Sequence, residues 1–348
     1  MKMLICGGDF DRESGKKSKI IEKLSAELIK YFDTDIFNGG NLNEITNIDF
    51  SKYDIALWCP NISNDEEKII PNIKAINQKI LLISTKRVIE KQYSDFDVVG
   101  HLLKNKSNLG IKITKDSNNR YQFKLIDPLG NEYYDGAELS ELASSIGDRV
   151  KFIKGLKRIK SQRVGEKREF KISEEFIDFI KHTGCEFTKY VNAVNPNRFL
   201  GNASTRCMFG FPAEKQNERL FVTQRNIDKE LIETNGFVEV TTNTEVVEYY
   251  GDKKPSVDTP IQIRLFDYYK NINFMVHGHV YIEDTKMTHS KIPCGFIEEF
   301  EEIIEMYPSR EESSFAVNLK GHGCLIVGNS VEDLWKYAKF KSRDLTEK

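Results

Sequence analysis

The sequence predicts an α/β protein of two domains, the first of which is a doubly wound parallel sheet. Its 348 residues exceed what one hydrophobic core usually serves. Hydrophobic residues make up 39% of the chain, which is enough for ordinary globular cores. The first half alternates short apolar runs with amphipathic stretches, the pattern of strands and helices in a parallel sheet. The second half opens with a helix signal after Ser173 and then consists mainly of short strands and turns.

Four short apolar runs in the first half predict the strands of the parallel sheet. Each run ends in glycine or polar turn residues, and helical periodicity separates the runs. They are residues 3–6, 34–37, 54–59 and 79–84. Two later runs, residues 109–113 and 120–126, are joined by Asp116–Asn119 and predict a hairpin at the edge of this sheet.

Residues 149–168 differ in composition from what surrounds them. They hold nine lysines and arginines against a single acid, Glu166, and they show no strong apolar period. We interpret this segment as a basic interdomain linker, which gives domains at residues 1–148 and 169–348. A solvated segment is the usual explanation of such a composition, and a phosphate or RNA contact is the alternative.

The overall charge and the cysteines predict a cytoplasmic protein. The net charge of −2 gives no electrostatic case for binding nucleic acid or a membrane. No run approaches the roughly 20 apolar residues of a membrane-spanning helix, and the first residues do not form a signal peptide. The six cysteines are dispersed, so they indicate neither a disulfide framework nor a paired metal motif.

Three of the six histidines predict a metal site in the second half. His277 and His279 are two residues apart in an apolar strand, so both project to the same face of it. Gly278 between them keeps the opposite face free of bulk. His322 lies between two glycines, which permit a tight turn that aims its ring inward. Three histidines with an open fourth position are typical of a catalytic zinc, although the first pair alone would more often be polar residues on a half-buried strand.

Five short segments of the second half form a recognisable series. They are Gly201-Asn202-Ala203-Ser204, Phe221-Val222-Thr223, residues 254–260 (KPSVDTP), Val276-His277-Gly278-His279, and Gly321-His322-Gly323 with Val327-Gly328 beyond it. Taken in this order, they resemble the class II aldolase/adducin family, typified by L-fuculose-phosphate aldolase and ribulose-phosphate 4-epimerase. The resemblance covers roughly residues 170–345 and implies an α/β domain with a central, mostly antiparallel sheet.

The resemblance implies roles for particular residues. His277, His279 and His322 match the family's metal ligands and would hold zinc or another divalent metal. Asp258 occupies the position of the acid/base carboxylate, as general base or as a fourth neighbour of the metal, and the sequence does not choose between these. The residues expected to bind substrate phosphate are Asn202, Ser204, Thr223, Ser256 and, as an additional contact, Arg225.

Three departures from the family leave the substrate open. Gln224-Arg225-Asn226 stands where the family usually has Pro-Ser-Gly or similar. Gln262 stands where many relatives have histidine, and Tyr281 does not match the position of the family's catalytic tyrosine. Aldol cleavage, epimerisation and dehydration are therefore all retained as reaction branches.

The loop after the first strand is a second candidate site. Gly7, Gly8, Ser14 and Lys16 lie between a predicted parallel strand and the following helix, where phosphates often bind. The spacing fits neither a P-loop nor the dinucleotide fingerprint. We expect a structural or regulatory module here rather than a nucleotide or sugar-phosphate site.

Together these observations predict a zinc-dependent lyase, epimerase or dehydratase that acts on a phosphorylated sugar or polyol. A metal-stabilised enediolate would be the shared intermediate of these reactions. The alternatives are an adducin-like scaffold without chemistry and a nucleotide-binding protein that uses the first domain. The resemblance also implies a homo-oligomer such as a tetramer. Zinc, manganese and cobalt are not separated, because sites of three histidines accept several ions.

Overall fold

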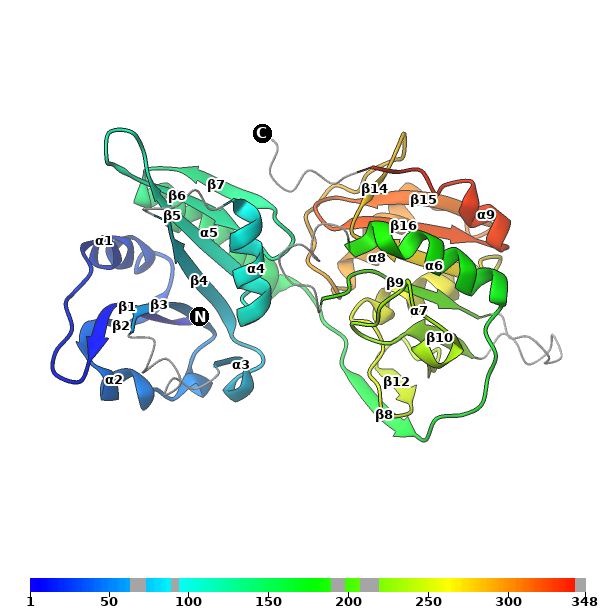
Figure 1. Ribbon diagram of the computed structural model, residues 1–348, viewed down its shortest axis with the longest axis horizontal. Coiled ribbons are helices and arrows are strands. Elements are labelled where there is room, and N and C mark those ends of the chain that lie inside the picture. The colour runs from blue at the N-terminus through cyan, green and yellow to red at the C-terminus, as the bar shows by residue number, and fades with distance from the viewer. Residues whose placement is uncertain (63–72, 89–93, 189–197, 207–218, 342–348) are drawn as a thin grey trace. The chain divides into compact units, whose positions relative to one another are not determined.

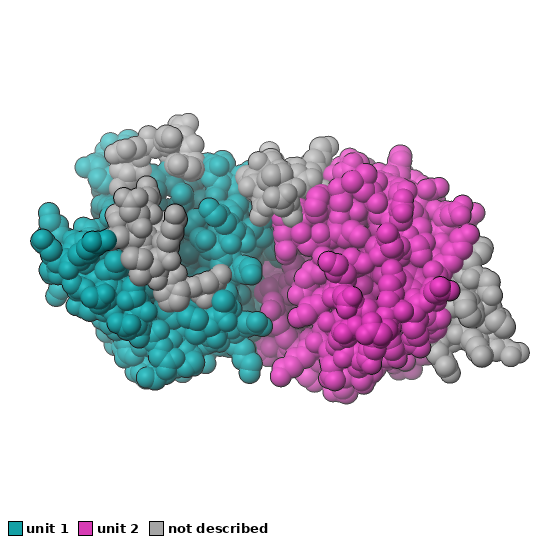
Figure 2. Space-filling model, turned by 60° about the horizontal axis from the view of Figure 1, so that its bottom comes forward, with its two compact units in different colours: residues 1–154, 345–348 teal, residues 155–344 magenta. Residues whose placement is uncertain are grey.

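The computed structural model describes residues 1–62, 73–88, 94–188, 198–206 and 219–341 (Figure 1). The chain divides into two compact units, Met1–Lys154 and a second that begins at Gly155 (Figure 2). Each unit contains its own large sheet with helices packed on it, so the predicted α/β class is confirmed. Among the described helices, none is both long and apolar enough to cross a membrane.

The first unit contains a seven-stranded sheet in the order β2-β1-β3-β4-β5-β6-β7. The pairs from β2 to β5 are parallel, and β6 and β7 add antiparallel strands. The predicted hairpin is β5–β6, but it lies one strand inside the edge because β7 pairs with β6. The strands are β1 Lys2–Asp11, β2 Asp33–Asn41, β3 Ile55–Asn61, β4 Leu81–Arg87, β5 Leu109–Lys115, β6 Tyr121–Ile126 and β7 Glu132–Gly136.

Helical segments cover both faces of this sheet, as expected of a doubly wound fold. On one face, Leu4, Ala56 and Leu82 pack in a cluster that includes residues from the 3-10 turn Phe50–Lys52 and from α3. On the other face, Gly7 lies directly against Ile21 of α1. The helices are α1 Lys19–Leu28, α2 Leu42–Thr46, α3 Ile73–Ile76, α4 Asp95–Asn105 and α5 Leu139–Gly155.

The segment predicted to be a linker, residues 149–168, is largely regular structure. Its first part is the end of α5, whose residues Val150 and Ile153 are buried. Its second part contains strand β8, Ser161–Gly165, which pairs in parallel with β12 at the edge of the second sheet. The predicted linker differs from the structure because most of the basic side chains lie on the exposed sides of α5 and β8. These many basic residues obscured the pattern of the few apolar residues that pack against the rest of the protein.

The second unit contains an eight-stranded sheet in the order β15-β16-β13-β9-β10-β11-β12-β8. All of its described pairs are antiparallel except β12–β8. A small second sheet pairs β14 Tyr281–Ile282 with β17 Phe340–Lys341. The strands of the large sheet, besides β8, are β9 Asn202–Thr205, β10 Leu220–Thr223, β11 Phe237–Val240, β12 Val247–Tyr250, β13 Phe274–Gly278, β15 Ser314–Leu319 and β16 Gly323–Gly328.

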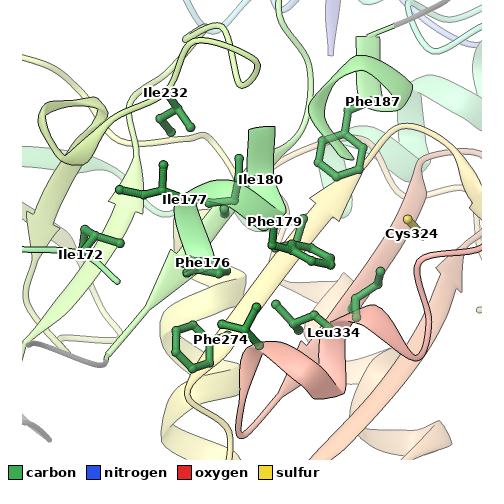
Figure 3. Packing of buried hydrophobic residues seen from close by; sticks show 14 of the residues in the cluster. Ile172, Phe176, Ile177, Phe179, Ile180, Phe187, Ile232, Phe274, Cys324 and Leu334 are labelled. Atoms are coloured by element: carbon green, nitrogen blue, oxygen red, sulfur yellow. The ribbon is translucent and has the colours of Figure 1, made fainter. Parts of the chain in front are cut away.

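Two hydrophobic clusters, one on each face of this sheet, form the core of the second unit. Phe176 and Phe179 of α6 pack with Phe274 of β13 and Leu334 of α9 on one face (Figure 3). The cluster on the other face joins Met275 to residues of α7 and α8. The helices are α6 Glu174–Thr188, α7 Thr259–Tyr268, α8 Glu298–Met306 and α9 Val331–Trp335; Thr234–Gly236 forms a 3-10 turn.

Candidate metal centre

Strand β13 directs His277 and His279 to the face of the sheet that α7 and α8 cover. Side chains alternate along the strand: Phe274 belongs to the cluster beneath α6, and Met275 belongs to the opposite cluster. Both histidines, at odd positions, therefore share the face of Met275. Gly278 faces the other way, where the Phe187 ring would lie 2.4 Å from a Cβ atom at this position. A glycine between the two histidines is therefore required by packing.

His322 lies in the turn between β15 and β16, and its neighbouring glycines allow this turn. Gly321 has a φ of +69°, a left-handed conformation that glycine adopts without strain. A Cβ atom at Gly323 would lie 2.0 Å from the carbonyl oxygen of Gly278, so no side chain fits there. This close approach brings the fully buried His322 ring within 4.6 Å of the His277 ring and 5.0 Å of the His279 ring, measured between ring centroids.

The three imidazoles meet the requirements of a divalent metal site. One ligand nitrogen from each ring lies within 4.8 Å of the other two, and all three residues are buried. His277 Nδ1 donates to the carbonyl oxygen of Cys324 at 2.8 Å, and His322 Nδ1 lies 2.7 Å from Glu299 Oε1. In the described part of the chain, the Nε2 atoms of His277 and His322 are buried without a hydrogen-bond partner. Such outer hydrogen bonds orient histidines toward metals.

The electrostatics of the centre suit the binding of a cation. Burial lowers the pKa of His277 to about 4, so this ring is neutral near neutral pH and retains a lone pair. Burial raises the pKa of Glu299. Burial alone would lower the pKa of His322, but Cys294 and Glu299 outweigh it and raise that pKa. A divalent ion at Nε2 of His322 would take the place of a proton on that atom, and the hydrogen bond between His322 Nδ1 and Glu299 would be kept.

Asp258 lies beside the histidines at the start of α7. Its Oδ2 atom is 4.0 Å from His277 Nε2 and accepts a hydrogen bond of 2.9 Å from Asn202 Nδ2. Gln262 in turn donates to Asn202 Oδ1. The side chain of Asp258 makes no capping hydrogen bond to α7, and its Oδ1 atom is buried without a partner among the described residues. The carboxylate is thus held in place while one oxygen remains available.

Backbone hydrogen bonds link several of the residues predicted to bind phosphate. Thr223 accepts a hydrogen bond of 3.1 Å from the Ala203 N–H through its hydroxyl, and its carbonyl accepts from the Ser256 N–H at 3.2 Å. Ser204 is fully buried, and its hydroxyl has no hydrogen-bond partner within the described structure. Arg225 is exposed, and its backbone N–H donates to the carbonyl of Lys254. Asn202 instead supports Asp258, as described above.

Sequence reasoning missed three residues of the centre. Glu299 belongs to a run of acids that resembles a solvated helix face, so nothing marked it out. Cys294 belongs to no paired metal motif in the sequence, yet its sulfur lies with Asp258 and His322 in a second group of potential ligands. Lys229 is 1% exposed and its Nζ atom has no hydrogen-bond partner in the described chain. Burial, and next the charge of Arg198, lower the pKa of Lys229 to about 7.

The N-terminal loop has a different geometry from the one predicted. Strand β1 continues to Asp11, so Gly7 and Gly8 are part of the strand rather than of a loop. The Gly15 N–H donates to the Gly40 carbonyl, and the Asp9 N–H donates to the Lys16 carbonyl. A Cβ atom at Gly15 would lie 1.8 Å from the Asp9 carbonyl oxygen. The glycines therefore serve close backbone packing, and Ser14 and Lys16 are exposed.

The first unit contains a cavity of about 500 Å³ between β3, β4 and α4. Its lining contains two lysines, one histidine and no acid; the charged and aromatic residues are Trp58, Lys86, His101 and Lys104. None of the four residues predicted for the N-terminal ligand loop lines it.

Part of the second unit is similar to a known protein family. Residues 197–281 match the family described as the class II aldolase and adducin N-terminal domain. The match contains Asn202, Thr223, Asp258, His277 and His279, and it ends before His322. The resemblance of the second half of the chain to the class II aldolase/adducin family is thereby confirmed.

Solved structures similar to this chain include two aldolases. An L-fuculose 1-phosphate aldolase is 18% identical over 49% of this chain and 85% of its own, with a TM-score of 0.33. The L-fuculose-1-phosphate aldolase from Thermus thermophilus is 16% identical over 48% of this chain and 87% of its own, with a TM-score of 0.32. A DNA/pantothenate metabolism flavoprotein from Streptococcus pneumoniae is 13% identical over 44% of this chain and 98% of its own, with a TM-score of 0.33. No curated protein matches the chain.

Proposed function

We propose that this chain is a metal-dependent enzyme of the class II aldolase type, a lyase or epimerase that acts on a phosphorylated sugar or related polyol. The observation that carries the proposal is the convergence of three buried histidines at one point. The rings of His277 and His322 are fixed through Nδ1, while their buried Nε2 atoms have no partner in the described structure. Buried polar atoms without partners are rare in folded proteins and commonly mark functional sites.

His277, His279 and His322 would hold the ion, which we propose to be zinc. When bound, the ion would supply Lewis-acid stabilisation for the negative charge that develops on a ketose oxygen. Asp258 is the group in this chain best placed to move a proton. Its Oδ2 atom is held by Asn202, and its Oδ1 atom is buried without a partner among the described residues, so a substrate proton can be taken there.

Gln262 contributes to this arrangement by positioning Asn202 rather than by contacting the ion. Its side-chain amide donates to Asn202 Oδ1, and Asn202 donates to Asp258 Oδ2. This chain of hydrogen bonds fixes the orientation of the carboxylate. Because all three residues are buried, bulk water does not compete for these bonds, which strengthens the electrostatic interactions at the centre.

Recognition of a phosphate is supported by the polar groups next to Asp258. Ser204 offers a buried hydroxyl without a hydrogen-bond partner in the described chain, and Thr223 and Ser256 are linked to it through β9 and β10. Arg225 is the second residue after β10. We further propose that Lys229 adds a buried positive charge, which would bind an anionic group strongly in so dry an environment.

The adducin-like alternative has no support from the centre. A scaffold without chemistry would not need three buried histidines with their outer hydrogen bonds in place. The nucleotide-binding alternative stays a prediction for the first unit.

The deciding experiment is metal analysis of the full chain by inductively coupled plasma mass spectrometry. We expect about one zinc per chain in the wild type and none in the His277→Ala/His279→Ala variant. A matched control is His182→Ala/His289→Ala, because both of these histidines are exposed and belong to the same unit. The control should keep its zinc and its ability to cleave or epimerise phosphorylated ketoses. If the wild type contains no metal even after zinc is added back, the proposed function is wrong.

A further inference from the structure

Cys294 lies at the edge of the three-histidine centre and has no role in the proposed chemistry so far. Its sulfur, an oxygen of Asp258 and a ring nitrogen of His322 all lie within 4.8 Å of one another. The cysteine does not form a disulfide. This group and the three-histidine group have His322 in common. The Nε2 atom of His322 is buried and has no hydrogen-bond partner among the described residues.

Backbone contacts hold the Cys294 segment in place. Gly295 has a φ of +80° and packs on the carbonyl of Val257, where a Cβ atom would lie 2.8 Å from the oxygen. The Arg158 guanidinium donates to the Cys294 carbonyl at 3.4 Å, and Arg158 forms a β-bridge with Phe296. The cysteine is therefore fixed against the segment that carries Asp258, the residue following Val257.

From this geometry we propose that Cys294 supplies a thiolate as a fourth protein ligand to the metal held by His277, His279 and His322. The inference rests on the proposed metal-dependent function and adds to it a ligand that the family resemblance does not imply. Binding breaks the S–H bond of the thiol and forms a metal–sulfur bond, and the released proton passes to solvent. No oxidant or reductant takes part.

A thiolate ligand determines which metal the centre prefers. Sulfur is a soft ligand that suits zinc and cobalt, whereas manganese and magnesium prefer oxygen. Three neutral imidazoles alone would leave this choice open. With Cys294 bound, four protein groups would hold the zinc, and an oxygen of a substrate would bind beside them or in place of the thiolate. Cys294 thus sets the specificity for the metal and closes the centre when no substrate is present.

Cobalt substitution tests this ligand directly, because thiolate bound to Co²⁺ gives a charge-transfer absorption band in the near ultraviolet. The zinc of the full-length chain is replaced by Co²⁺, and spectra are recorded beside metal analysis of the same samples. We expect the band in the wild type and its loss in Cys294→Ser, while that variant still binds cobalt. Cys185→Ser is the matched control: Cys185 is an exposed cysteine on α6, and its substitution should leave the band unchanged.

X-ray absorption of the zinc-loaded wild type gives a second measurement that needs no variant. A sulfur scatterer at about 2.3 Å from zinc supports the proposal. In competition between Zn²⁺ and Mn²⁺, Cys294→Ser should show a weaker preference for zinc than the wild type. Cobalt or zinc bound without a sulfur signature overturns the thiolate ligand and leaves the three-histidine site standing. A wild type that binds no metal at all overturns the proposed function as well.

Discussion

The two units treat buried charge in opposite ways. In the first unit, the Asp95 carboxylate is 8% exposed and accepts from Lys112 Nζ at 2.8 Å and from Lys124 Nζ at 3.1 Å. Lys124 also lies within 3.3 Å of Glu132 and Asp135. In the second unit, Lys229 and one oxygen of Asp258 are buried without any hydrogen-bond partner in the described structure. The buried charge of Asp95 in the first unit is thus paired, whereas Lys229 and one oxygen of Asp258 in the second unit have no partner among the described residues.

This difference separates charges that hold a fold together from charges that are kept for a ligand. A buried charge with several partners recovers its lost hydration, whereas an unpaired one lowers the stability of the fold. The second unit also pairs buried charge away from the histidines, since Glu239 bonds to Arg219 and Arg168. The oxygen of Asp258 that has no partner among the described residues lies beside the histidines, as expected where a fold gives up stability for binding.

Removing Asp95 should have the largest effect on stability. Asp95→Ala leaves Lys112 and Lys124 with less compensation in a mostly buried position, and we expect a loss of about 3 kcal/mol in the free energy of unfolding. Urea unfolding measures this loss, and hydrogen exchange locates it in the first unit. The exposed Asp148→Ala on α5 is the control and should change little. An unchanged midpoint for Asp95→Ala would contradict the stabilising role of this cluster.

The contribution of Asp95 should also depend on pH. Burial alone would raise the pKa of Asp95, but the ammonium groups of Lys112 and Lys124 outweigh it and hold that pKa below 3.8. The carboxylate therefore stabilises the fold fully above its unfolded pKa, and this contribution is lost as the pH falls through the folded value. The stability difference between wild type and Asp95→Ala should accordingly shrink in acid.

Glu299→Gln should weaken metal binding without abolishing it. The carboxylate of Glu299 accepts from His322 Nδ1, and outer partners of this kind usually contribute about 10- to 100-fold to metal affinity. Titration with a chromophoric chelator measures the zinc dissociation constant. Glu301→Gln, an exposed substitution on the same helix, should leave the constant unchanged. Equal zinc affinity in all three proteins would show that Glu299 does not orient His322 for a metal.

Lys229→Met should produce the smallest effect and one of opposite sign. Replacing a buried ammonium that has no partner by an apolar side chain of similar length should raise the free energy of unfolding by about 1 kcal/mol. The pKa of Lys229 lies near 7, below its ordinary value of 10.5. Between these two values the unfolded state therefore binds more protons than the folded state. The destabilisation of the fold by Lys229 is greatest below pH 7 and decreases as the pH rises.

The gain in Lys229→Met should therefore be greatest in mildly acidic solution and vanish at high pH. Thermal unfolding across pH measures it, with the exposed Lys270→Met as the matched removal of one positive charge. The same variant should bind inorganic sulfate more weakly than the wild type, since the proposed role of the lysine is to hold an anion. A destabilised Lys229→Met would indicate a structural role instead.

Features of the structure that depend on periodicity and spacing could be predicted from the sequence. The strands of the first unit follow from apolar runs, and the shared face of His277 and His279 follows from the alternation of a strand. The roles assigned to His322 and Asp258 depended on resemblance, because residues so far apart in the chain meet only in the folded sheet. The structure brings both residues beside His277.

What the sequence missed are contacts that depend on tertiary packing. Glu299 and Lys229 occur among other charged residues and differ from them only in being buried by the surrounding sheet and helices. Cys294 showed no spacing that would relate it to a histidine. The role of Gly7 and Gly8 was mispredicted for another reason: a phosphate-binding loop and tight backbone packing both use glycine.

The close approach of Gly323 to the Gly278 carbonyl has a consequence for how the second unit assembles. The two glycines join the end of β13 to the turn between β15 and β16, which lie far apart along the chain. An ion held by His277, His279 and His322 would cross-link this corner. Because no such site exists in the unfolded chain, the binding free energy of the ion would add to the cooperativity of the second sheet. Chelation should therefore let that corner open first, before the strands on the β8 side separate.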